Sequence, residues 1–235
     1  MPRRPVRARI TACLLLASLA PGAVEPAPAI DYAPAELSRQ STNPLKPADH
    51  DKGGEMTPKL LEPGDYDALA EHFKRQNAEA DHLGLPLFSP FTGLPDALEP
   101  ERRARRLSQW ARPLTEPVWQ RTWGVRGGDG GPIVAHLDLT GPEFKVELHR
   151  AKVSLGVEPA YHRQGIGERL LREAIAFARR AGLAWLDLWV FAHSAPAWAL
   201  YHKIGFIEVG RLPDQFRIGQ MSIEDVAMVL QLDPI

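Results

Sequence analysis

The stretch from Val153 to Ala181 constrains the fold of this chain most, because its hydrophobic period changes from two to 3.6 within a few residues. Val153, Leu155 and Val157 alternate with small residues, which indicates a strand. From Ile166 onward, apolar residues recur at helical spacing and charged residues occupy the opposite face. The sequence therefore predicts a strand that leads through a tight turn into an amphipathic helix.

The turn between this strand and this helix contains two glycines, Gly165 and Gly167. Glycine adopts backbone angles that other residues resist and has no side chain, so backbone amides can converge on one point. The unpaired amides of the first helical turn and the positive end of the helix dipole add to the attraction for an anion such as pyrophosphate. A Gly-x-Gly turn is also a common tight connection, so the turn alone does not decide between the two interpretations.

Two familiar nucleotide motifs are excluded at this turn. The dinucleotide-binding fingerprint requires a third glycine three residues after the second, where this chain has Leu170. The P-loop requires Lys followed by Ser or Thr after its last glycine, where this chain has Glu168 and Arg169.

The segment from His162 to Gly167, His-Arg-Gln-Gly-Ile-Gly, resembles the pyrophosphate loop of GCN5-related N-acetyltransferases (GNAT), Gln/Arg-x-x-Gly-x-Gly/Ala. His162 departs from the first position of that pattern. The later segments 186–190 and 197–206 resemble the family's next strand and the helix that follows it, with its Gly-Phe end. Ser194 stands where the family usually has Asn. The resemblance covers residues 56–232 and is most specific between Val153 and Phe206.

This resemblance implies an α/β (α+β) fold with a mixed, mostly antiparallel central sheet flanked by helices. The fourth and fifth strands would splay apart to hold the co-substrate acetyl-CoA. We expect the fourth strand at 144–157, with a bulge near Arg150 and Ala151. The residues expected to bind acetyl-CoA are Leu155, Val157, His162, Arg163, Gln164, Gly165, Ile166, Gly167 and Ser194.

The resemblance also implies catalytic roles for three side chains. Tyr201 occupies the family's general-acid position, and its phenol can donate a proton to the leaving sulfur. Glu147 and His149 lie two residues apart on the expected fourth strand, hence on one face, and are candidates for the general base. The alternative for this pair, polar residues on a sheet surface, is given equal weight.

The chemistry implied is direct transfer of an acetyl group from acetyl-CoA to a primary amine of a small molecule or amino acid. Two alternatives remain open: a catalytically idle acyl-CoA-binding sensor, and a protein N-terminal or lysine acetyltransferase. The expected partner is a small-molecule amine acceptor, and a homodimer is compatible with the sequence.

Charge and composition argue against other partners. A net charge of −1 favours neither nucleic acid nor a membrane surface. The four arginines between 102 and 106, in a helix expected at 95–111, are interpreted as a solvated face. No Cys and His spacing predicts a metal site.

Residues 1–55 are rich in Pro and Ala and poor in aromatic residues, which predicts a signal-like or disordered extension. Arginines precede an apolar run at 12–17, and small residues follow it, as in an export signal. Because acetyl-CoA is made and kept inside the cell, we expect a cytoplasmic protein, with export as the alternative. The N-acetyltransferase domain is assigned to 56–235.

Several further elements follow from local pattern. Asp65 is the expected N-cap of a helix that ends near Ala80, and Ser194 is the expected cap of a later helix. The glycine-rich segment 126–131 predicts a hairpin between strands at 119–125 and 132–139. Two closing strands, 207–209 and 227–230, are expected to flank a loop at 211–218, and the family resemblance implies that this loop forms a wall of the substrate site.

Overall fold

The computed structural model describes residues 56–83, 99–128, 130–218 and 220–232. The chain divides into two units, 1–50 and 51–235, and all described residues belong to the second. The predicted extension at 1–55 therefore lies outside the described residues. The strands are β1 (Lys59–Leu60), β2 (Gln120–Arg126), β3 (Ile133–Thr140), β4 (Arg150–Val157), β5 (Trp185–Phe191), β6 (Ile207–Ile218) and β7 (Met221–Gln231). The helices are α1 (Tyr66–Leu83), α2 (Pro100–Ala111), α3 (Ile166–Arg180) and α4 (Ala195–Ile204).

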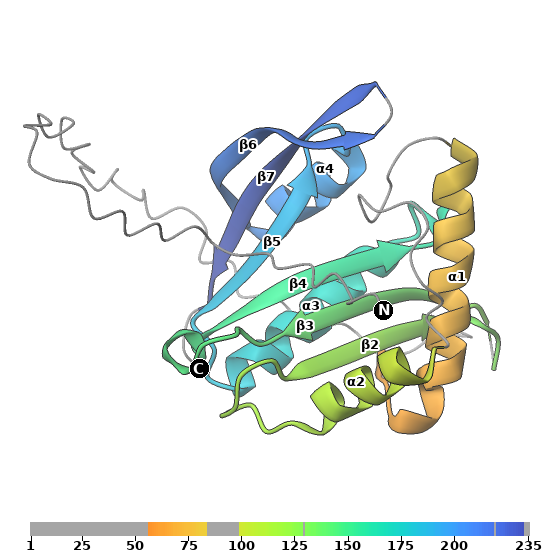
Figure 1. Cartoon of the computed structure of the whole chain (residues 1–235), viewed down its shortest axis with the longest axis vertical. Coiled ribbons are helices and arrows are strands. Elements are labelled where there is room, and N and C mark those ends of the chain that lie inside the picture. Colours follow the sequence, from red (N-terminus) through yellow and green to blue (C-terminus); the bar gives the residue numbers. More distant parts are fainter. Residues whose placement is uncertain (1–55, 84–98, 129, 219, 233–235) are drawn as a thin grey trace, which may run out of the picture. The chain divides into compact units, whose positions relative to one another are not determined.

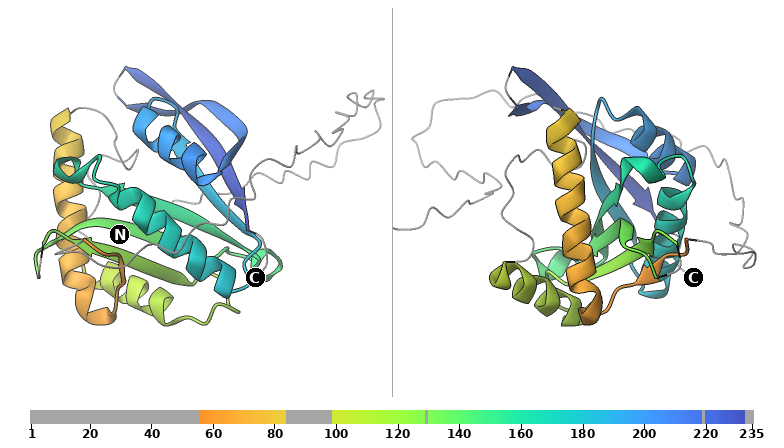
Figure 2. Two further views of the ribbon diagram at one scale, coloured as in Figure 1. Left: turned by 180° about the vertical axis from the view of Figure 1, so that it is seen from behind. Right: turned by 90° about the vertical axis from the view of Figure 1, so that its right-hand side faces the viewer.

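The strands form one sheet in the order β1-β2-β3-β4-β5-β7-β6 (Figure 1). Every neighbouring pair is antiparallel except β4 and β5, which run parallel. Helices α1 and α2 cover one face of the sheet, and α3 and α4 lie on the other, as the view from behind shows (Figure 2). The predicted mixed, mostly antiparallel sheet flanked by helices is confirmed.

The core lies between the sheet and α3, whose apolar face is the one predicted from its periodicity. The buried residues of this helix are Ile166, Leu170, Leu171, Ala174, Ile175 and Ala178. Phe177 adds an edge-to-face contact with Trp123 of β2, at 5.2 Å between ring centroids. On the polar face, Glu168 binds Arg172 one turn away and Lys203 of α4, which ties the two helices together.

The start of α1 differs from the prediction. Asp65 is the last residue of a 3-10 turn, Pro63–Asp65, and its carboxylate accepts a hydrogen bond from the backbone N–H of Glu62. Asp65 therefore caps this short turn, and α1 begins at Tyr66 and continues to Leu83. The predicted hairpin between β2 and β3 is confirmed.

The predicted strand at 144–157 is wrong in its first half. A 3-10 turn, Lys145–Glu147, precedes β4, which begins only at Arg150. Arg150 and Ala151, where the bulge was expected, pair with Trp185 and Leu186 of β5, and neither this ladder nor the one between β3 and β4 contains a register shift. The break in alternation marks the place where the strand starts.

The segment 211–218, expected as a loop, belongs to β6, which pairs with β7 as a long hairpin. The register shifts between Leu212 and Phe216, on either side of Pro213. A proline cannot donate to the ladder, and a bulge accommodates it without ending the strand. The segment predicted as a loop is therefore part of the β6–β7 hairpin.

Candidate active site

Strands β4 and β5 are paired at only three positions: Arg150↔Trp185, Ala151↔Leu186 and Lys152↔Asp187. Beyond Asp187, β5 continues along β7 alone, and β4 continues along β3. Arg150 closes the base of the gap with a bidentate ion pair to Asp187, at 2.9 and 2.5 Å. The predicted splayed strand pair is confirmed.

The edge of β4 that faces this gap has no β5 partner beyond Lys152. The N–H of Glu158 donates to the carbonyl of Val134 at the end of the β3–β4 ladder. In an antiparallel ladder, alternate residues turn their backbone groups to opposite sides, so Val153, Leu155 and Val157 direct theirs toward the gap. Leu155 and Val157, both predicted to bind the co-substrate, therefore lie where a ligand in the gap would meet their backbone.

The glycine turn leads from the end of β4 into α3. Gly165 is the N-cap residue with φ of +72°, in the left-handed region, and no side chain caps the first-turn amides. A Cβ added at Gly167 would lie 3.0 Å from Cδ2 of Leu200, so this position has little room for a side chain. The side chain of Ile166 is buried, which leaves its backbone amide as its contribution. These features fit an anion such as a diphosphate.

The remaining predicted loop residues are exposed. His162, which departs from the family pattern, lies with Nε2 2.8 Å from the carbonyl oxygen of Val157. His162 is therefore a hydrogen-bond partner of a backbone carbonyl at the mouth of the gap. Arg163 has a positive φ of 60°, and the Gln164 side chain donates to the carbonyl of Ala160 at 3.4 Å.

Arg169 is a residue of this loop region that sequence reasoning missed. Its Nη1 donates to the carbonyl of Gln164 at 3.1 Å, so the guanidinium curls back over the turn. Its Nε is buried without a hydrogen-bond partner among the described residues. The spacing of four residues from Gly165, one helical turn, is the signal that could have identified it.

Ser194 lies at the N-cap of α4, as predicted, but its side chain makes no capping hydrogen bond. Its backbone carbonyl accepts the bond from the N–H of Trp198 that begins the helix. The predicted side-chain cap is therefore wrong.

Tyr201 lies on α4 among core residues and is 7 % exposed. Its ring packs edge-to-face on Phe206 at 5.7 Å. Burial raises the pKa of its phenol to about 12. The hydroxyl is therefore protonated at neutral pH, as a proton donor must be.

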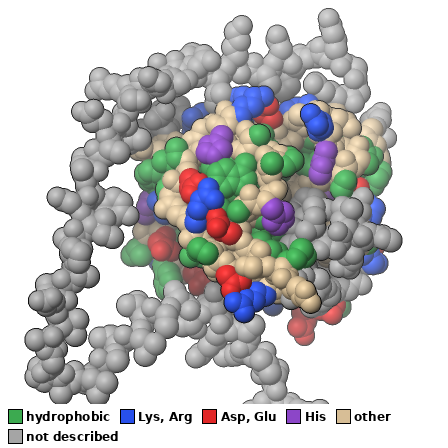
Figure 3. Space-filling model, turned by 90° about the horizontal axis from the view of Figure 1, so that it is seen from above, with side chains coloured by type: hydrophobic (Ala, Val, Ile, Leu, Met, Phe, Trp, Pro, Cys, Tyr) green, Lys and Arg blue, Asp and Glu red, His purple; other side chains and the backbone are tan. Residues whose placement is uncertain are grey.

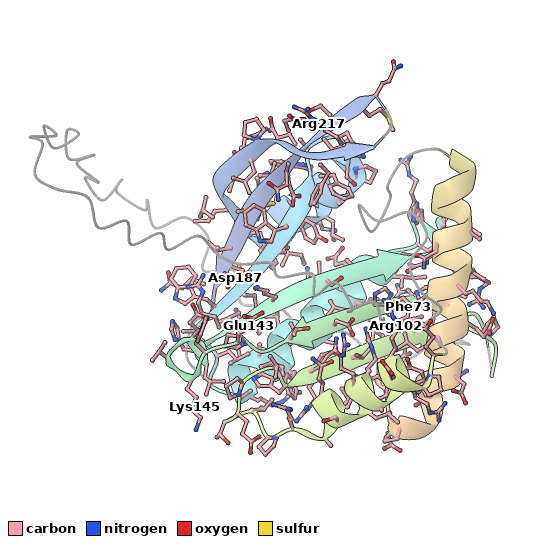
Figure 4. All side chains as sticks on the ribbon, in the orientation of Figure 1. Phe73, Arg102, Glu143, Lys145, Asp187 and Arg217 are labelled. Atoms are coloured by element: carbon pink, nitrogen blue, oxygen red, sulfur yellow. The ribbon has the colours of Figure 1, made fainter. Side chains whose placement is uncertain are left out.

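Glu147 and His149 do not lie on the fourth strand as predicted. Glu147 ends the 3-10 turn and His149 precedes β4, and both are exposed. Figure 4 shows the neighbouring Lys145 at the end of the sheet where β4 begins, away from the β6–β7 hairpin. At ~3.3 Å per residue, His149 lies roughly 13 Å along the strand from Val153, where the gap opens. The structure does not bring these two residues to the gap.

A buried polar network supports the point where β4 ends. His72 of α1 lies with Nδ1 2.7 Å from Oε1 of Glu158 and with Nε2 3.0 Å from Nδ1 of His136 on β3. Arg75 donates from Nε to the same carboxylate at 3.0 Å. Burial lowers the pKa of His72 and lowers that of His136 to about 3. Both rings are therefore neutral, and the network holds Glu158 just before the glycine turn.

The described residues form neither a metal site nor a membrane-spanning helix. No group of three or more His, Cys, Asp or Glu side chains among them is arranged to hold a metal ion. None of the helices in this part of the chain has the length and apolar character that crossing a membrane requires.

The chain resembles known proteins in sequence. A family model described as Acetyltransferase (GNAT) family matches residues 89–206. The chain is 38 % identical over 108 residues to N-alpha-acetyltransferase RimI of Mycobacterium tuberculosis, covering 46 % of this chain and 62 % of that relative. It is 44 % identical over 118 residues to the [Ribosomal protein bS18]-alanine N-acetyltransferase of Escherichia coli, covering 50 % of this chain and 76 % of that protein. The matches thus span between about three fifths and three quarters of these two relatives.

Solved structures share the fold. A GNAT-family acetyltransferase from Streptococcus pneumoniae superposes with a TM-score of 0.64 at 23 % identity, covering 76 % of this chain and all of that one. The structure of yncA from Salmonella typhimurium, solved with acetyl-CoA, gives a TM-score of 0.61 at 22 % identity, covering 77 % of this chain and 96 % of that one. With the family model matched across half of its length, the chain belongs to the GNAT acetyltransferase family.

Proposed function

We propose that this protein transfers the acetyl group of acetyl-CoA to a primary amine of a small molecule or an amino acid. The observation that carries the proposal is the gap between β4 and β5, which opens after Lys152 and ends beside the glycine turn of α3. We assign the activity to residues 56–235. A cytoplasmic location is part of the proposal, because acetyl-CoA is found inside the cell.

Each part of the site has a physical role in holding acetyl-CoA. The first-turn amides of α3 and the guanidinium of Arg169 suit the diphosphate, since both present positive charge at one place. The backbone groups of Val153 and Leu155 along the gap suit an extended arm with amide groups of its own. When bound, acetyl-CoA supplies an activated acetyl thioester.

Tyr201 is proposed as the donor of a proton to the sulfur that leaves. Its pKa, raised by burial to about 12, keeps the hydroxyl protonated at neutral pH. General acid catalysis of this kind contributes a factor of ~10²–10⁴. Neither Glu147 nor His149 is assigned as the general base, because both lie at the end of β4 opposite to the gap.

The names of two relatives support a second candidate function. RimI of M. tuberculosis is an N-alpha-acetyltransferase, and the E. coli relative acts on the alanine of ribosomal protein bS18. A protein N-terminus is also a primary amine. Acetylation of a protein N-terminus is therefore tested beside the small-molecule function.

The experiment that tests the proposal combines binding and turnover. Purified protein is titrated with coenzyme A by calorimetry. It is then mixed with acetyl-CoA and a panel of small amines, amino acids and peptides with free N-terminal alanine, while release of free thiol is followed. Turnover on amines or amino acids supports the proposal, and turnover on peptides alone supports the second candidate. Coenzyme A binding without turnover on any acceptor would instead indicate an idle sensor.

A further inference from the structure

A pocket lies on the sheet beyond the point where β4 and β5 separate. It has a volume of about 190 Å³ and is lined by Trp189 of β5, Leu212 and Gln215 of β6, and Asp225 of β7. Leu212 is the register partner of Asp225 across the β6–β7 ladder, so both side chains lie on the same face. The pocket is thus built from three adjacent strands.

Asp225 at this pocket is an acid with little access to water. It is 7 % exposed, and burial raises the pKa of its carboxyl. Its carboxylate has the backbone N–H of Val226 as a hydrogen-bond donor. No Lys, Arg or His forms an ion pair with it in the part of the chain that the structure describes. Such a carboxylate is unfavourable unless a cation joins it.

The two nearby arginines of β6 are occupied by other acids. Arg211 binds Glu208 at 2.5 Å and Glu224 at 2.8 Å. Arg217 binds Asp214. The hairpin therefore pairs its exposed charges among themselves and leaves the buried Asp225 uncompensated.

Aromatic residues lie near Asp225 on the same face of the sheet. Trp189, which lines the pocket, is 49 % exposed although it is a large apolar side chain. Phe191, the register partner of Asp225 on β5, packs edge-to-face on Phe216 of β6 at 5.9 Å. Hydrophobic side chains gather, beside adjacent acidic and basic ones, on the end of the molecule that carries this hairpin (Figure 3). Aromatic faces attract an ammonium group, and a carboxylate among them increases that attraction.

The pocket lies beside the gap. Asp187 is the last residue of β5 paired with β4, and Trp189 follows two residues later on the same face of the strand. On the opposite face of β5, Leu186, Leu188 and Val190 belong to the core. A molecule in the pocket would thus lie next to the place where the strands have just opened.

We propose that this pocket binds the acceptor of the reaction through a positively charged ammonium group, with the Asp225 carboxylate as its counter-ion and Trp189 as its aromatic wall. The inference rests on the proposed acetyl transfer and narrows the acceptor to a molecule that arrives with an ammonium group. If that group is the nitrogen that is acetylated, it must give up a proton before its lone pair attacks the thioester. Neutral analogues of the same shape should bind to the pocket more weakly, because they leave the Asp225 carboxylate without a partner. Asp225 is thereby assigned a role in specificity.

The first test measures binding without turnover. Protein saturated with coenzyme A is titrated with benzylammonium and with its neutral analogue benzyl alcohol, and binding is followed by NMR chemical shifts. We expect the cation to bind at least tenfold more tightly to the wild type, and the preference to disappear in Asp225→Asn. Equal affinity for the two probes, or a preference that persists in Asp225→Asn, overturns the proposal.

Glu224→Gln is the matched control. Glu224 is the neighbour of Asp225 on β7 and points to the opposite face, where it binds Arg211. The substitution removes the same charge one residue away, and we expect it to retain the cation preference. If Glu224→Gln loses the preference as well, the effect is one of general charge and the proposal fails.

Stability and kinetics provide independent readouts. Because Asp225 has no counter-charge among the described residues, Asp225→Asn should leave Tm unchanged or raise it, whereas a large fall in Tm would reveal a structural partner and contradict the proposal. On any acceptor found in the thiol-release panel, Asp225→Asn should raise KM for the acceptor at least tenfold and leave KM for acetyl-CoA within twofold. Absence of all turnover in the wild type rejects acetyl transfer, while the probe titration still decides whether the pocket binds a cation.

Discussion

Lys152 of β4 and Asp187 of β5 are the last residues paired between the two parallel strands. Beyond them each strand keeps only its antiparallel neighbour, β3 or β7. A parallel pair that opens in the middle of a sheet leaves strand edges whose backbone groups need partners. The site proposed for acetyl-CoA and the pocket at Asp225 both lie along this opening.

Gly165→Glu should weaken coenzyme A binding at least tenfold. The substitution places a carboxylate at the mouth of α3 and forces a non-glycine residue into the left-handed region, which costs ~1–2 kcal/mol. Calorimetric titration measures the effect. Gly182→Glu is the control, because Gly182 has a similar φ of +73° and open space around it at the other end of α3. The Gly182→Glu variant should lose a similar amount of stability and keep the wild-type affinity for coenzyme A.

Arg169→Gln should raise the Kd for coenzyme A about tenfold or more, since hydrogen bonds to charged groups contribute ~1.5–3 kcal/mol. The expected difference becomes smaller at high salt, because ions screen the attraction. Titrations at two salt concentrations measure both effects. Arg180→Gln, an exposed change in the last turn of α3, should bind like the wild type. Equal affinities for the two variants would remove Arg169 from the site.

Tyr201→Phe should lower kcat by ~10²–10⁴ and leave KM for acetyl-CoA nearly unchanged. Because the pKa of the hydroxyl is about 12, titration of Tyr201 should cause no loss of activity between pH 7 and 10. Steady-state rates across this pH range provide the measurement. Tyr66→Phe removes a hydroxyl at the start of α1 and should keep kcat. A Tyr201→Phe enzyme of wild-type rate would exclude the proton-donor role.

Stability should fall as the pH decreases below about 6.5. Folded His136 stays neutral down to a pKa of about 3, whereas the unfolded chain binds the proton near the ordinary value of 6.5. Between these values the unfolded state holds more protons, so the free energy of unfolding decreases with falling pH, by at most ~1.4 kcal/mol per pH unit for one histidine.

Urea unfolding at pH 7, 6 and 5 measures this slope. His136→Asn cannot titrate and should show a shallower slope, even if its stability at pH 7 is lower. An unchanged slope in His136→Asn would contradict the assignment of this pH dependence to His136.

Leu171→Ala should lower the free energy of unfolding by ~2–5 kcal/mol, because Leu171 is fully buried between α3 and the sheet and its loss leaves a cavity. Chemical denaturation followed by circular dichroism measures the change. Ile207→Ala, at a half-exposed position on β6, should change stability by less than about 0.5 kcal/mol. Similar decreases in the free energy of unfolding of both variants would contradict the position of Leu171 in the core.

Much of the architecture could be read from local pattern. The change of period between Val157 and Ile166 specified a strand, a turn and a helix, because backbone preferences and side-chain periodicity act over a few residues. The hairpin of β2 and β3 was also predictable, because the turn that precedes Ile133 is rich in glycine. The glycine turn, its loop residues and Tyr201 were also recognisable, because they form a contiguous motif in the chain.

The start of β4, and with it the position of Glu147 and His149, depended on contacts outside the local sequence. Alternation in a single segment cannot show where a neighbouring strand stops pairing, so the predicted strand was too long. The continuation of β6 past Pro213 was missed for the same reason, since its partner β7 sustains the ladder.

The sequence by itself thus determined the strand, glycine turn and helix around Gly165, together with the family motif they carry. Only the tertiary structure decided that His72 meets Glu158 across 86 positions, and that Trp189 and Asp225 line one pocket. The burial of Asp225, and its lack of a counter-charge within the described part of the chain, are properties of groups gathered from distant segments. They arise when the sheet assembles, and no local stretch of residues contains them.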